Sequence, residues 1–212
     1  MASQGRIPAV VLAGGRATRM GGADKALMPL GGRTLLDHVI DRLAPQAAPL
    51  AINANGDPIR FVRFGLPVLS DTLAGFRGPL AGILAGMDWA ETLGVGQIVS
   101  VAADTPFFPQ DLVARLQAVV APSGLVLAAL RGADGAVRLQ PTFGLWPVSL
   151  RAALRRDLIA GHAKVQQWAT AHGAAIAVFD EQPMAGFFNV NTPEDLLLAD
   201  QMVAAGPPDF DV

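Results

Sequence analysis

The sequence predicts an α/β protein: a single domain with a mostly parallel sheet flanked by helices. Several short, nearly continuous apolar runs end in glycine or polar residues, and helix-like segments lie between them. This alternation is typical of parallel strands that are buried on both faces. Hydrophobic residues make up 51% of the 212 residues and charged residues 16%, which favours a folded core over disorder. We expect the domain to span residues 6–205, with flexible tails at 1–5 and 206–212.

Apolar runs that end in turn or polar residues predict the strands, and amphipathic segments predict the helices. The predicted strands are Ile7–Leu12, Leu50–Ile52, Leu66–Leu69, Gln97–Ala102, Leu125–Leu130 and Ala175–Phe179. The predicted helices are Thr34–Leu43, Pro79–Trp89, Gln110–Val119, Leu150–Ile159, Val165–Ala171 and 193 to about 204. Thr34 and Thr192 are suited to be N-caps, and Pro79 and Pro193 suit the first turn of a helix.

Composition excludes several classes of function. The chain has no cysteine, which excludes disulfides, thiolate nucleophiles and cysteine-ligated metals. A net charge of −2 provides no basic field to hold nucleic acid. The apolar runs are shorter than the ~20 residues that cross a bilayer, and the first residues, MASQGRIP, lack the apolar segment of a signal peptide. We therefore expect a cytoplasmic protein without a nucleic-acid or membrane partner.

A glycine-rich loop follows the first predicted strand, in VVLAGGRATRMGGADKALMPLGG (Val10–Gly32). Glycine N–H groups can form a nest for an anion, and Arg16, Arg19 and Lys25 supply charges for a polyphosphate. The P-loop spacing is absent because Lys25 is followed by Ala26 instead of Ser or Thr. The dinucleotide fingerprint is absent because Arg16 stands where glycine is required. The glycines and cations of the loop predict a phosphate-binding site that belongs to neither of these two motifs. An ordinary surface turn with solvated cations is the simpler alternative.

Polar residues follow three further strands: Asn53, Asp71 and Asp104. Ligands of open α/β sheets bind at the carboxyl ends of the strands, so we expect these side chains to line one site. Asp104 can hold Mg²⁺ against phosphates, or it can merely cap the turn that begins at Thr105.

The loop LAGGRATRMGGADKALMPLGG resembles the signature of nucleotidyltransferases with a glycosyltransferase-A-like α/β fold. Within that superfamily the chain resembles the molybdenum cofactor guanylyltransferases over almost its whole length. The segments INANGD, LSDTLAGFRGPLAG, VAADTPFFPQDL, QPTFGLW and FFNVNTPEDL carry the resemblance, in the family's order. It implies Mg²⁺-dependent transfer of GMP from GTP to the phosphate of molybdopterin or molybdenum-molybdopterin, with release of pyrophosphate and formation of molybdopterin guanine dinucleotide. Guanylyl members typically have LAGG, as here, whereas cytidylyl relatives typically have LAAG.

The resemblance also implies roles for individual residues. The catalytic residues would be Arg19, Lys25 and Asp104. The nucleotide would contact Leu12, Ala13, Gly14, Gly15, Lys25, Asn53, Asp71 and Asp104. The pterin substrate would contact Gly78, Asn189 and Asn191. Asp104 would bind the metal, with Asn191 as the candidate second ligand.

Other functions remain open at this point. The chain could be a molybdopterin cytidylyltransferase or a sugar-phosphate nucleotidyltransferase of the same fold. A non-catalytic nucleotide-binding delivery protein is the alternative of another class, but it would not need Arg19, Lys25 and Asp104 together. Cofactor-biosynthesis proteins and molybdoenzyme chaperones are further partners that the resemblance implies.

Overall fold

The computed structural model describes residues 6–14, 24–75, 78–180 and 186–206. The expectations for Gly15 and Arg19 therefore lie outside the described residues, as do residues 1–5 and 207–212 of the expected tails. A membrane-spanning helix is absent from the described ranges.

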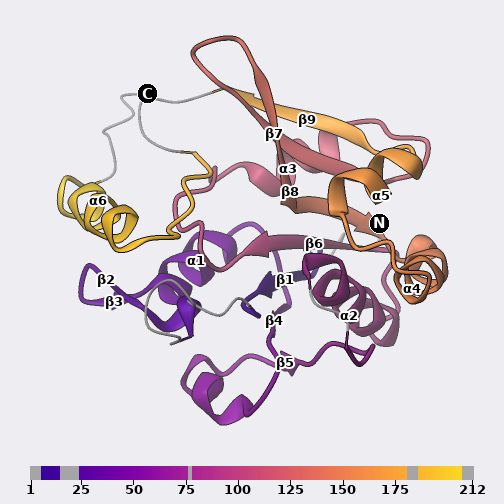
Figure 1. The fold of residues 1–212 in the computed structure, drawn as a ribbon, viewed down its shortest axis with the longest axis horizontal. Coiled ribbons are helices and arrows are strands. Elements are labelled where there is room, and N and C mark those ends of the chain that lie inside the picture. Colours follow the sequence, from indigo (N-terminus) through magenta and orange to yellow (C-terminus); the bar gives the residue numbers. More distant parts are fainter. Residues whose placement is uncertain (1–5, 15–23, 76–77, 181–185, 207–212) are drawn as a thin grey trace.

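Seven strands form the main sheet, in the order β5-β4-β1-β6-β8-β7-β9 (Figure 1). The strands are β1 (Ala9–Leu12), β4 (Leu50–Asn53), β5 (Val68–Leu69), β6 (Gln97–Ala102), β7 (Val126–Arg131), β8 (Val137–Pro147) and β9 (Ala175–Asp180). Neighbouring strands from β5 to β6 run parallel, β8 is antiparallel to both β6 and β7, and β9 is parallel to β7. The predicted α/β class and mostly parallel sheet are confirmed. All six predicted strands are present, but β8 was not predicted.

Six α-helices and three 3₁₀ helices accompany the sheet in the described ranges. The α-helices are α1 (Leu35–Leu43), α2 (Pro79–Thr92), α3 (Leu112–Ala118), α4 (Arg151–Ile159), α5 (Val165–Ala171) and α6 (Pro193–Ala204). The 3₁₀ helices are η2 (Lys25–Leu27), η3 (Pro58–Phe64) and η4 (Val148–Leu150). Thr34 caps α1 and Thr192 caps α6, each through a capping box with the aspartate three residues on, so both N-cap predictions are confirmed.

The helices cover both faces of the sheet because the side chains of each strand alternate between two apolar clusters. On β1, Val11 packs in the cluster that contains the buried faces of α1 and α3. Its neighbour Val10 packs in the opposite cluster, with α2, α4 and α5. A small two-stranded sheet, β2 (Pro29–Leu30) with β3 (Arg33–Thr34), lies beside α6 at one end of the molecule (Figure 1). Because β1 pairs in parallel with both β4 and β6, the carboxyl ends of these three strands lie side by side.

Candidate active site

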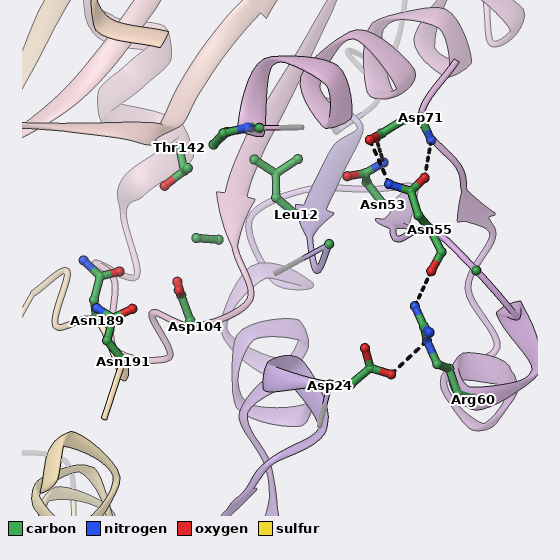
Figure 2. A pocket seen from close by; sticks show the side chains of 15 residues that line it. Leu12, Asp24, Asn53, Asn55, Arg60, Asp71, Asp104, Thr142, Asn189 and Asn191 are labelled. Carbon is green, nitrogen blue, oxygen red and sulfur yellow. Dashed lines mark hydrogen bonds and ion pairs between the residues drawn. The ribbon is translucent and has the colours of Figure 1, made fainter. Parts of the chain in front are cut away.

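A cleft of about 800 Å³ lies at the carboxyl ends of β4, β1 and β6 (Figure 2). Eight of the predicted site residues line it: Leu12, Gly14, Asn53, Asp71, Gly78, Asp104, Asn189 and Asn191. Ala13 is buried, and its N–H donates to the carbonyl of Asn53 at 2.8 Å. The carboxyl ends of the strands, where the sequence predicts a ligand, therefore border a cleft.

Lys25 joins three segments that are far apart in the sequence. Its ammonium lies 2.5 Å from Asp104 Oδ2, just beyond β6, and 2.5 Å from Asn191 Oδ1, just before α6. The side chains of Lys25 and Asp104 are 13% and 28% exposed, so water screens this ion pair only in part. The backbone N–H of Asn191 donates to Asp195, the carboxylate of the α6 capping box, at 2.8 Å. That hydrogen bond is the largest of the effects that lower the pKa of Asp195.

Asn189 lies on the same side of the cleft and is fixed by a buried threonine. The Thr105 hydroxyl lies 2.6 Å from Asn189 Oδ1 and 3.1 Å from Asp104 Oδ1. The N–H of Val190 donates to the Asp104 carbonyl at 2.9 Å. These contacts hold the segment before α6 against the loop after β6, so the two asparagines lie beside Asp104 on one side of the cleft (Figure 2).

Asn53 and Asp71 form the opposite side of the cleft. Asn53 is 4% exposed, and its Nδ2 donates to Asp71 Oδ1 and to the Leu69 carbonyl, both at 3.0 Å. α2 can pack close to Asn53 because residue 82 is glycine. A Cβ at Gly82 would come within 2.8 Å of Asn53 Cγ and 2.9 Å of Leu12 Cδ2. Gly78, the N-cap of α2, has a φ of 146°, which favours glycine.

Sequence reasoning missed three residues that line the cleft beside Asp71: Asp24, Asn55 and Arg60. Asn55 hydrogen-bonds Asp71, Arg60 donates to the Asn55 carbonyl at 2.5 Å, and Arg60 Nε lies 3.0 Å from Asp24 Oδ2. The dashed lines in Figure 2 follow this chain of contacts from Asp24 to Asn53. The motif NAN, which repeats asparagine two residues after Asn53, could have indicated Asn55. The sequence carries no comparable signal for Arg60.

No group of three or more His, Asp or Glu side chains with the spacing of a metal site occurs in the part of the chain that the structure describes. The cleft instead offers one carboxylate, Asp104, and one amide oxygen, Asn191, in contact with the same ammonium group. These are hard oxygen ligands, and they approach a single point closely enough to share one cation.

The chain matches known proteins in sequence and in fold. Residues 9–176 match the family model described as MobA-like NTP transferase domain. A molybdenum cofactor guanylyltransferase from Bradyrhizobium sp. (strain ORS 278) is 48% identical over 203 residues, covering 93% of each chain. The protein of that name from Mesorhizobium japonicum is 46% identical over 204 residues, covering 93% of this chain and 96% of its own.

Solved structures show the same fold at lower sequence identity. Molybdopterin-guanine dinucleotide biosynthesis protein A from Archaeoglobus fulgidus has a TM-score of 0.73 at 20% identity, over 94% of this chain and all of its own. 2-C-methyl-D-erythritol 4-phosphate cytidylyltransferase from Thermus thermophilus has a TM-score of 0.69 at 22% identity, over 94% of this chain and 99% of its own. The glycosyltransferase-A-like nucleotidyltransferase fold and the resemblance stated from the sequence are confirmed. The chain belongs to the MobA-like NTP transferase family and is a nucleotidyltransferase.

Proposed function

We propose that the protein transfers GMP from GTP to the phosphate of molybdopterin or its molybdenum-loaded form. The observation that carries the proposal is the arrangement of the cleft, with Asp104 and Asn191, joined by the Lys25 ammonium, on one side and the Asn53–Asp71 pair on the other. The names of relatives that are 46–48% identical over at least 93% of this chain support it. A GTP-dependent reaction also agrees with the cytoplasmic location that the sequence predicts.

The reaction breaks one phosphoanhydride bond and forms another. An oxygen of the pterin phosphate attacks the α-phosphorus of GTP, the bond from this phosphorus to the bridging oxygen breaks, and pyrophosphate leaves. Such transfers depend mainly on positioning and on neutralisation of charge. The cleft, at about 800 Å³, is in the upper part of the usual range for small-molecule sites, so it has room for a nucleotide and part of a second substrate.

Lys25 is assigned to the triphosphate, where its ammonium would stabilise the charge that develops on the leaving pyrophosphate. Arg19 is proposed for the same task and lies outside the described residues. Asp71 and Asn53, with the backbone of residues 12–14, would bind the nucleoside. Asn189 and Gly78 are proposed to contact the pterin.

Mg²⁺ fits the oxygen pair of Asp104 and Asn191, because Mg²⁺ in proteins typically takes one or two carboxylates together with phosphate oxygens. When bound, it would supply charge neutralisation at the phosphates. In the described structure the Lys25 ammonium contacts both oxygens and so holds Asp104 and Asn191 together.

The test is incubation of the protein with Mg²⁺, molybdopterin and each of GTP, CTP, ATP and UTP, with detection of pyrophosphate and of the dinucleotide product. We expect product with GTP. Preferential use of CTP would instead identify a cytidylyltransferase. Tight GTP binding without pyrophosphate release would identify a delivery protein.

A further inference from the structure

Asn55 makes a reciprocal pair of hydrogen bonds with Asp71. The Asn55 amide Nδ2 donates to Asp71 Oδ2 at 2.8 Å, and the backbone N–H of Asp71 donates to Asn55 Oδ1 at 2.9 Å. On the other carboxylate oxygen, Oδ1, Asp71 accepts from Asn53 at 3.0 Å. Each oxygen of the carboxylate is thus held by one amide, and rotation about the bond to the carboxyl group would break both hydrogen bonds.

Asn55 is itself held in place through its backbone. Its carbonyl accepts from Arg60 Nη2 at 2.5 Å, and Arg60 Nε lies 3.0 Å from Asp24 Oδ2. The Arg60 guanidinium also lies 4.9 Å from the ring centroid of the buried Phe61. Arg60 in η3 therefore contacts both Asp24, which precedes Lys25, and the loop that carries Asn55. That loop is held by Arg60 through the Asn55 carbonyl and by Asp71 through the Asn55 side chain.

A carboxylate held in this way retains acceptor capacity for a ligand. Each carboxylate oxygen can accept about two hydrogen bonds, and Asp71 lines the cleft, so among the described residues each oxygen keeps one further acceptor position for a ligand. The N1–H and the 2-amino group of guanine are adjacent donors that match two parallel acceptors. Cytosine and adenine present a ring-nitrogen acceptor beside their amino group, and that acceptor would face the negative carboxylate.

We propose that Asn55 is a positioning residue for guanine recognition, which holds the Asp71 carboxylate in the orientation that accepts N1–H and the 2-amino group together. The proposal rests on the proposed use of GTP. It assigns Asn55 no contact with the reacting phosphates. Loss of Asn55 should therefore weaken selection of the base.

The experiment compares dissociation constants for GTP and for inosine triphosphate, which lacks the 2-amino group, in the presence of Mg²⁺. In Asn55→Ala we expect GTP affinity to fall at least about 10-fold, the scale of one hydrogen bond to a charged group. Affinity for inosine triphosphate should fall less, so the ratio between the two moves toward one. Asn55→Asp keeps the acceptor for the Asp71 N–H but replaces the donor to Oδ2 by an oxygen that repels it, so it should move the ratio in the same direction.

Ile59→Ala is the matched control, since Ile59 lies nearby in η3 and its side chain is 68% exposed. It should keep the wild-type ratio. An unchanged ratio of GTP to inosine triphosphate affinity in both Asn55 variants, or an equal loss for both nucleotides, would overturn the role of Asn55. A wild-type protein that binds CTP more tightly than GTP would overturn the proposed function itself, whatever the variants do.

Discussion

The close approach of α2 to β1 and β4 can be tested by two substitutions one helical turn apart, Gly82→Ala and Gly86→Ala. A Cβ at Gly82 would come within 2.8 Å of Asn53 Cγ, on a side chain of the cleft. A Cβ at Gly86 would come within 2.7 Å of Val10 Cγ1, in the apolar cluster under α2. Both add one methyl group to the same helix face, but only the first displaces a residue of the candidate site.

The expected free energies follow from these contacts. Glycine to alanine in a helix interior stabilises by about 1 kcal/mol, and overpacking costs about 1–3 kcal/mol. Helix propensity and overpacking together should therefore make each variant up to about 2 kcal/mol less stable than wild type. In Gly82→Ala the displaced Asn53 amide also loses its hydrogen bonds to Asp71 and the Leu69 carbonyl, worth about 1 kcal/mol each.

The assay measures GTP affinity by calorimetry in Mg²⁺, together with the free energy of unfolding. We expect Gly82→Ala to bind GTP at least about 10-fold more weakly and Gly86→Ala to bind it as wild type does. A folded Gly82→Ala variant with wild-type affinity would refute the placement of Asn53 in the nucleotide site. Equal losses in the two variants would show that general destabilisation, not displacement of Asn53, controls binding.

Three further outcomes are expected. Lys25→Met should raise the affinity of the nucleotide-free protein for Mn²⁺, because both oxygens that contact the ammonium lose this partner. Lys164→Met, at the other lysine of the chain, should leave the Mn²⁺ affinity unchanged. Metal titration followed by electron paramagnetic resonance measures these affinities, and equal affinities of Lys25→Met and wild type would contradict the prediction. Asp104→Asn should stay folded, turn over at least about 100-fold more slowly, and no longer respond to Mg²⁺. A variant whose rate still rises with Mg²⁺ as in wild type would contradict the assignment of Asp104 as a metal ligand. Burial opposes ionisation of Asp37, but hydrogen bonds, led by that from Arg63, lower its pKa to about 2. Since this is below the unfolded value of about 3.9, the stabilisation by the ionised carboxylate is present above pH 4 and is lost between pH 4 and 2. Arg63→Gln should therefore lower the free energy of unfolding by about 1 kcal/mol at neutral pH and by little at pH 2, and chemical denaturation that gives the same difference at both pH values would contradict the pairing.

The helices and parallel strands could be predicted from the sequence because local signals specify them. Thr34 and Thr192 are capped by side chains only three residues away, so the first turns of α1 and α6 are encoded locally. β8 was missed because its pattern is interrupted. The pairing with β7 moves from Ala128–Gln140 to Leu127–Gly144, which leaves residues 141–143 in a bulge. Pro141 can be accommodated there because proline has no N–H to donate to the ladder.

The candidate site could be predicted only where the fold itself brings residues together. Asn53 and Asp104 meet at one cleft because β4 and β6 are both parallel neighbours of β1. Arg60 reaches the cleft through the conformation of the 3₁₀ segment η3, and no periodicity of the sequence determines where that segment lies. The contact of Lys25 with Asn191 likewise depends on how the segment before α6 packs against the loop after β6.

The most direct measurement is a crystal structure with Mg²⁺ and a GTP analogue that has a methylene group between the α- and β-phosphorus atoms. We expect the base against Asp71, the phosphates beside Lys25 and the metal on Asp104. A nucleotide bound in the cleft in the reverse direction, with its phosphates at Asp71, would contradict the assigned roles. A nucleotide bound elsewhere on the molecule would contradict the site itself.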